Sequence, residues 1–78
     1  MIATNTTSPE SEVLNEVHQA LSEQLFRLSQ NLTCEFREGL LLLRGRVSSY
    51  YHKQVAQEAV RRLDAVDQII NQIEVVPA

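Results

Sequence analysis

The apolar residues of this 78-residue chain first follow a helical period, then a strand period, and then repeat both. From Pro9 to about Ser29 they are spaced by three or four residues, which predicts one amphipathic helix. Ser8, Pro9 and the glutamates that follow are typical of a helix start. The buried stripe of this helix is expected to contain Val13 with Leu14, Val17, Leu21, Leu25 and Leu28.

Two strands joined by a tight turn are predicted next. Residues 32–37 alternate apolar and polar side chains, and residues 40–47 are predicted as their antiparallel partner. Glu38 and Gly39 form the turn, because glycine tolerates the positive φ that a two-residue turn requires. The second strand is expected to place Leu41, Leu43, Gly45 and Val47 on one face and Leu40, Leu42, Arg44 and Arg46 on the other.

A second helix and a third strand complete the pattern. Ser48 or Ser49 opens the helix, which is expected to end near Asp64 and Ala65. The buried stripe of the helix is expected to contain Tyr51 or His52, Val55 with Ala56, Ala59 with Val60, and Leu63. The strand covers residues 66–76, with Ile69, Asn71, Ile73 and Val75 on one face, and Pro77 ends it.

The order helix, strand, strand, helix, strand predicts an α+β fold. We expect a two-layer sandwich in which both helices cover one face of a three-stranded mixed sheet. Residues 8–78 are interpreted as a single domain, and residues 1–7 as a flexible N-terminal tail. Gly45, in the middle of a strand, either lets a helix backbone come close or marks a β-bulge.

Charge and cysteine content restrict the function. The net charge is −3 and the pI is about 5.2, which disfavours a nucleic-acid partner because such domains usually carry a basic patch. The same balance disfavours docking on anionic lipid, although a local basic patch leaves that alternative open. Cys34 has no partner for an internal disulfide, and residues 1–7 have no features of a signal peptide, so we expect a cytoplasmic protein.

The sequence contains no motif that predicts catalysis. His18 and His52 are far apart and lack neighbours at metal-ligand spacing, which argues against a metal site. Cys34 falls on the predicted core face, where a thiol is expected to be buried and inert. Two glycines also cannot form a phosphate-binding loop. Because the sequence supplies no cluster of convergent titratable groups, we expect no enzyme activity, cofactor or small-molecule substrate.

A set of spaced positions runs from the hairpin to the last strand, namely Glu38, Gly39, Leu41, Leu43, Gly45, Val47, Ser49, Lys53, Ala56, Ala59, Ala65, Val66, Ile69, Asn71, Ile73 and Val75. Through these positions the region resembles the BON domain, a small bacterial module. The resemblance spans roughly residues 13–76 and implies the same fold, no catalysis, and a role in binding phospholipid surfaces or attaching proteins to one another. Ala65 stands where the family usually has glycine, so either the helix ends differently or Asp64 takes the left-handed conformation.

The sheet face opposite the helices is the candidate interaction surface, because apolar and basic residues together on a helix-free face are typical of an interface. The preferred hypothesis is association with protein, including a second copy in a two-fold dimer. One alternative is phospholipid binding through the arginines, and another is that arginine stems simply cover the leucines. The surface comprises Arg37, Leu40, Leu42, Arg44, Arg46, Ile70, Gln72, Glu74 and Val76.

Two smaller features complete the prediction. Residues 50–53, with two tyrosines, a histidine and a lysine, form a second candidate contact for head groups or a partner. One of these tyrosines is expected to pack in the core and the other to lie on the surface. Gly39, Gly45 and Asn71 are interpreted as structural, with Asn71 bonding a neighbouring backbone group.

Overall fold

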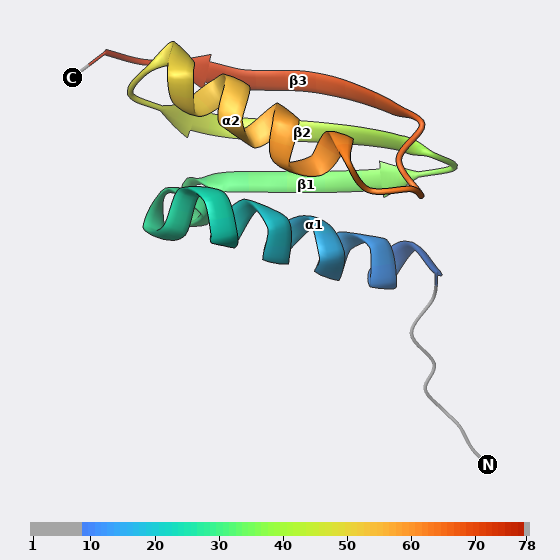
Figure 1. The fold of residues 1–78 in the computed structure, drawn as a ribbon. Helices are drawn as coiled ribbons and strands as arrows, with labels where there is room; N and C mark the ends of the chain where they lie inside the picture. The colour runs from blue at the N-terminus through green and yellow to red at the C-terminus, as the bar shows by residue number, and fades with distance from the viewer. Residues whose placement is uncertain (1–8, 78) are drawn as a thin grey trace.

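The computed structural model describes residues 9–77, and its elements follow the predicted order (Figure 1). The expected cap at Ser8 and the expected tail over residues 1–7 lie outside the described residues. Both strands of the hairpin have the predicted bounds. The elements are α1 (Pro9–Leu25), the 3₁₀ helix η1 (Phe26–Asn31), β1 (Leu32–Arg37), β2 (Leu40–Val47), α2 (Tyr50–Arg61) and β3 (Gln68–Val75).

The three strands form one mixed sheet in the order β1-β2-β3. β1 runs antiparallel to β2, and β3 runs parallel to β2. α1 and α2 lie side by side on the same face of this sheet (Figure 1). The fold is therefore the predicted α+β sandwich of two layers.

The core lies between the helices and the inner face of the sheet. Three of the four predicted inner residues of β2 are buried, because the two-residue period of a strand directs them toward the helices; these are Leu41, Leu43 and Val47, while Gly45 is half-buried. Burying one Leu, Ile or Val contributes roughly 1.5–3 kcal/mol, so these side chains hold the two layers together. The buried residues are Val13, Val17, Leu21, Leu25, Leu32, Leu41, Leu43, Val47, Ala56, Val60 and Ile73.

The hairpin turn also fixes the start of β3. Glu38 and Gly39 both have positive φ, 51° and 86°, as in the turns that suit two-residue hairpins. The Gly39 carbonyl accepts hydrogen bonds from the backbone amides of Asp67 at 2.8 Å and Gln68 at 3.1 Å. The backbone of Gly39 therefore joins the turn to the last strand.

Gly45 allows a close backbone approach, but not by the helices over the sheet. Its φ is 139°, and an added Cβ would overlap the carbonyl oxygen of Asn31 and lie 2.9 Å from the Cα of Leu32. The neighbour is thus the junction of η1 and β1 rather than α1 or α2. The alternative of a bulge does not apply to this ladder, because its register runs without a break from Leu32 opposite Gly45 to Arg37 opposite Leu40.

The first helix ends earlier than predicted. α1 stops at Leu25, and Phe26, the first residue of η1, takes the left-handed conformation with φ 54°. The apolar spacing continues to Leu28, which still packs against the core, so the side-chain pattern concealed the change of backbone.

The second helix also ends sooner than expected, at Arg61. Arg62, its C-cap, has an ordinary right-handed conformation with φ −79°. Within residues 9–77, the non-glycine residues with positive φ are Phe26 and Glu38. Of the two alternatives raised by Ala65, an altered helix end is therefore the one observed, and Asp64 is not left-handed.

Candidate functional site

The strand register brings the predicted surface residues together on the outer face of the sheet. Leu42 lies between Glu35 of β1 and Ile70 of β3, because both are its Cα partners. Arg44 lies beside Gln72, and Arg46 beside Glu74, in the same parallel pairing. Arg37 pairs with Leu40 at one end, and Val76 follows β3 directly at the other.

An apolar row crosses this outer face. Leu40 is 36% exposed, Ile70 is 39% exposed, and Leu42 between them is half-buried. Their sequence neighbours Leu41 and Leu43 are fully buried on the inner face. Among the described elements, both helices lie on the inner side, so this row faces away from the second layer.

Two of the three arginines on the outer face are held by neighbouring strands. Arg46 Nε lies 3.3 Å from Glu74 Oε1, and Arg44 Nε donates to Gln72 Oε1 at 3.3 Å. Arg44 Nη1 also lies 4.0 Å from Glu35 Oε2. Such exposed ion pairs contribute only about 0–1 kcal/mol to stability, but they direct the guanidinium groups along the sheet. The face therefore carries three arginines against two glutamates and is close to neutral.

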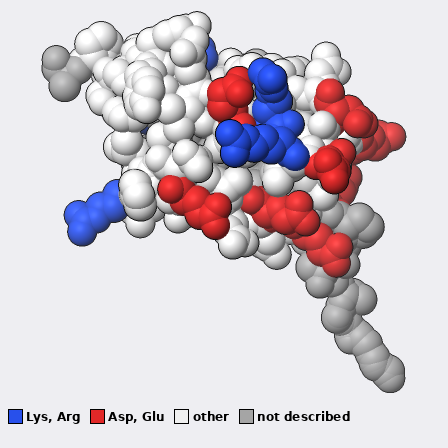
Figure 2. Space-filling model, viewed as in Figure 1, with Lys and Arg blue, Asp and Glu red and all other residues white. Residues whose placement is uncertain are grey.

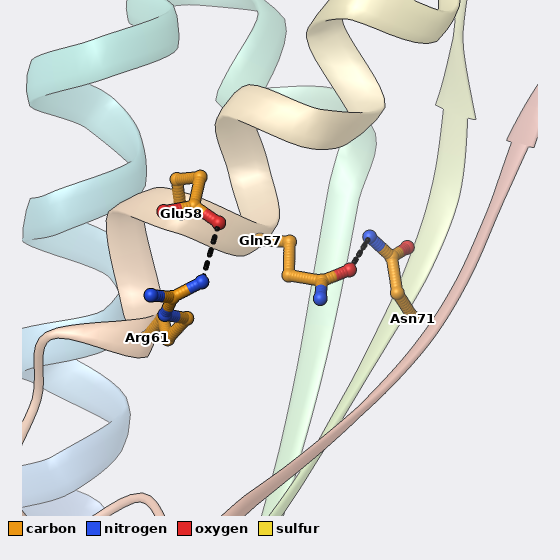
Figure 3. Close-up of polar contacts among 4 residues, drawn as sticks. All are labelled: Gln57, Glu58, Arg61 and Asn71. Carbon is orange, nitrogen blue, oxygen red and sulfur yellow. Dashed lines mark hydrogen bonds and ion pairs between the residues drawn. The ribbon is translucent and has the colours of Figure 1, made fainter.

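Asn71 joins the inner face of β3 to α2. Its side-chain amide donates to Gln57 Oε1 at 3.2 Å (Figure 3). The same amide donates to the Lys53 carbonyl at 3.3 Å. Its carbonyl oxygen accepts the backbone amide of Ile73 at 3.1 Å. Asn71 thus bonds backbone groups of both α2 and β3. The same view shows Arg61 beside Glu58 on α2, 3.1 Å apart, which is an ordinary surface pair (Figure 3).

Three of the four aromatic side chains are exposed at one end of the molecule. Phe26 is 75% exposed, Tyr50 62% and Tyr51 71%. They share this end because η1 leads into β1 at Leu32, which pairs near the end of β2, and α2 begins just after Val47 (Figure 1). Sequence reasoning missed Phe26, since no glycine or asparagine marks its left-handed position.

The expectation that one tyrosine packs in the core is wrong. His52 takes the half-buried position of the helix stripe, and its backbone amide donates to Ser49 Oγ at 3.3 Å, which identifies Ser49 as the N-cap. The His52 ring meets Tyr51 edge-on, with ring centroids 5.8 Å apart. Packing of the smaller Ala56 and Val60 directly against the sheet leaves the tyrosines outside.

Acidic side chains concentrate on the helix side of the molecule. α1 carries Glu10, Glu12, Glu16 and Glu23 and no lysine or arginine. Figure 2 shows acidic groups over α1 and toward the end where that helix begins, whereas the opposite end is mostly uncharged. The net charge of −3 is therefore not a property of the outer sheet face.

The remaining titratable chemistry is limited. Cys34 is half-buried on the inner side of β1, and burial raises the pKa of its thiol to about 11. At neutral pH this thiol is protonated, and thus a weak nucleophile. Across residues 9–77, no three His, Cys, Asp or Glu side chains are arranged to hold a metal ion, and no helix is long and apolar enough to cross a membrane.

Comparison with known proteins gives one family. The family model of the BON domain matches residues 10–77, which is nearly the whole chain and includes every strand and helix except the first residue of α1. A search of curated proteins finds no match. Because the match extends well beyond half of the chain, this protein belongs to the BON domain family.

Proposed function

We propose that this chain is a non-catalytic protein-association module whose binding surface is the outer sheet face. The BON family is generally non-enzymatic and is associated with binding phospholipid or protein. The observation that carries the proposal is the apolar row of Leu40, Leu42 and Ile70, in which Leu40 and Ile70 stay exposed and Leu42 is half-buried although two helices cover the other face. A contiguous apolar patch with polar residues around it is typical of an interaction surface.

The charge pattern favours protein over an anionic surface for this face. Arg44 and Arg46 are already paired with Gln72 and Glu74, so their guanidinium groups have partners within the sheet. Of the three arginines here, Arg37 is the one whose side chain has no hydrogen bond or ion pair to a described residue. A protein partner needs only an apolar patch and polar groups that meet this rim.

The size of the face indicates a weak or transient complex. An eight-residue strand spans about 26 Å and three strands about 14 Å, so the face covers roughly 400 Å². A stable interface buries about 800 Å² on each partner. Binding through this face alone therefore supplies about half of the usual area.

Site-specific photo-crosslinking in cells tests the proposal. A benzophenone amino acid at position 42 is expected to give discrete protein adducts, whereas the same group at the exposed position Glu16 of α1 is not. Mass spectrometry then identifies the partner, including a second copy of the chain. Adducts of equal yield from both positions, or lipid adducts alone from position 42, would contradict protein association through this face.

Phospholipid binding is the second candidate, and a separate observation favours it. The exposed rings of Phe26, Tyr50 and Tyr51 share one end of the molecule, with Arg27 and Lys53 next to them in the chain. Exposed aromatic rings beside basic residues suit the boundary between head groups and acyl chains. This end also lies away from the acidic start of α1 (Figure 2).

Vesicle co-sedimentation separates the two candidates. If lipid binds at the aromatic end, anionic vesicles retain the wild type and the Leu42→Glu variant at low salt, and replacing all three exposed rings by serine abolishes retention. If neither protein sediments with vesicles that contain 30% anionic lipid at low salt, the phospholipid candidate is excluded.

A further inference from the structure

Among the residues that the structure describes, β3 has one hydrogen-bonded neighbour and one free edge, because the strand order is β1-β2-β3. The backbone amide of Gln68 donates to Gly39, and that of Val76 donates to Val47, so even-numbered amides face β2. Successive residues of a strand alternate in direction. The amides that face the free edge therefore belong to Ile69, Asn71, Ile73 and Val75.

This edge lacks the usual protection against strand pairing. β3 is eight residues long, contains no lysine or proline, and has a continuous register with β2 from Gln68 to Val75. Natural edge strands are usually short, bulged or marked by such residues, because open donors and acceptors recruit other strands. One amide is already occupied, since that of Ile73 donates to Asn71 Oδ1. Among the described residues, the amides left open at this edge are thus those of Ile69, Asn71 and Val75, and Ile69 and Asn71 are the two consecutive ones.

We propose that a second copy of this chain pairs with that edge, β3 antiparallel to β3, in a two-fold register centred on Ile70. In this register Ile69 of one copy forms a hydrogen-bonded pair with Asn71 of the other, and symmetry repeats the pair. A register centred on Asn71 or Gln72 would need the Ile73 amide that the Asn71 side chain holds. The side chain of Asn71 therefore selects the register.

The side chains of the outer face suit this pairing. Ile70 meets Ile70 of the second copy at a non-hydrogen-bonded position, where Cα atoms lie about 4.5 Å apart. Leu42 is the Cα partner of Ile70, so the apolar row runs through both copies. Gln68 falls opposite Gln72, and Glu74 falls opposite Val66, so no like charges face each other.

The inner side of the edge has room for the second strand. A hollow of about 300 Å³ lies beside Asn71, between β3 and α2, with Tyr50, Lys53 and Gln57 in its lining. Ile69 of the second copy, opposite Asn71, would be directed toward this hollow. The Ile69 side chain of the second copy would cover the hydrogen bonds that join Asn71 to Lys53 and Gln57 of α2.

Pairing at the edge would also supply the area that one copy lacks. Two outer faces side by side cover roughly 800 Å², which matches the area that a stable interface buries on one partner. The match in binding area rests on the proposed function of the outer face, whereas the edge pairing itself does not. The dimer would present one six-stranded sheet with a single continuous apolar row.

Cysteine cross-linking tests the register. In a Cys34→Ala background, Ile70→Cys places two thiols at the two-fold centre, within the Cα separation that a disulfide needs. Gln72→Cys is the matched control on the same strand and face. In this register Gln72 of one copy lies opposite Gln68 of the other, so the two introduced cysteines lie about 13 Å apart along the strand. With added oxidant, we expect at least tenfold more covalent dimer from Ile70→Cys than from Gln72→Cys, and similar yields would overturn the register.

Solution mass over a concentration series separates failure of this inference from failure of the proposed function. We expect a wild-type dimer, a folded monomer for Ile70→Lys because like charges would face each other, and a dimer for Leu42→Lys. A dimer that Leu42→Lys dissociates would indicate stacking of the faces and overturn edge pairing. A wild-type monomer at every concentration would also overturn it, and adducts from position 42 would still support the proposed function.

Discussion

The two faces of β2 use the same residue type for different purposes. Leu41 and Leu43 are fully buried beneath the helices, whereas Leu40 is more than a third exposed and Leu42 is half-buried on the side without helices. The two-residue period of a strand alone separates the pairs. Composition therefore could not distinguish the leucines that hold the fold from those available to a partner.

The two sides of the molecule also differ in charge. α1 carries four glutamates without a basic residue, while the outer sheet face is close to neutral and its arginines are mostly paired. The net charge of −3 had weighed against a lipid partner, but it does not describe the outer sheet face. A charge argument about binding has to be made for one surface at a time.

The largest expected difference in stability between the two faces of β2 is between the neighbouring residues Leu43 and Leu42. Leu43→Ala is expected to lower the free energy of unfolding by about 3–4 kcal/mol, because it leaves a cavity among fully buried side chains. Leu42→Ala should cost about 1 kcal/mol or less, since its side chain is only half-buried. Urea unfolding of both variants measures the difference, and equal losses would mean that the outer face is covered in solution.

The two glycines of the hairpin give the next prediction. Gly45→Ala should destabilise the fold by about 3 kcal/mol, because its Cβ would overlap the backbone of Asn31 and Leu32, which cannot move aside. At Gly39 the Cβ would meet the side chain of Asp67, which can rotate, so about 1–2 kcal/mol is expected from the positive φ. Thermal unfolding of both variants would show whether backbone or side-chain contact sets the cost.

The sequence predicted the elements whose period is unambiguous. Both hairpin strands were placed correctly, because residues 32–37 alternate strictly and a turn with glycine fixes residues 40–47 as their partner. The end of α1 was misplaced, since Leu25 and Leu28 keep a helical spacing while Phe26 reverses the backbone. No local sequence signal distinguishes a helix that continues through Leu28 from one that ends at Leu25.

The polar contacts of the candidate site were beyond sequence reasoning. The pairs of Arg44 with Gln72 and of Arg46 with Glu74 join residues 28 positions apart. They depend on the exact register of a parallel strand pair, which a one-residue shift would change. The face of each residue was predictable, but its neighbours across the sheet were not.

Asn71 is a polar residue on the inner face of β3, so its loss can be compared with the loss of a polar residue on the outer face. Asn71→Ala removes bonds to Lys53, Gln57 and Ile73 and should cost about 1–2 kcal/mol. The matched change Gln72→Ala on the outer face removes only an exposed bond to Arg44 and should cost at most about 0.5 kcal/mol. Faster hydrogen exchange at the Ile73 amide in Asn71→Ala, but not in Gln72→Ala, would verify the tether.

Cys34 gives the smallest effect and tests the inner face at its β1 edge. Burial raises the thiol pKa to about 11 from an ordinary value of 9.0, so the native state holds this proton more tightly than the unfolded state. Its contribution to stability is therefore complete below pH 9 and is lost as the pH rises toward 11. Cys34→Ser should remove this part of the alkaline decline in stability.

The reactivity of the same thiol gives an independent measurement. A pKa higher by two units leaves about 100-fold less thiolate at pH 8, while the greater nucleophilicity of that thiolate offsets about tenfold. Native protein should thus react with iodoacetamide about tenfold more slowly than protein unfolded in urea. Equal rates would mean that β1 and α1 separate readily, in which case the inner face would be less firmly closed than the contrast between Leu42 and Leu43 implies.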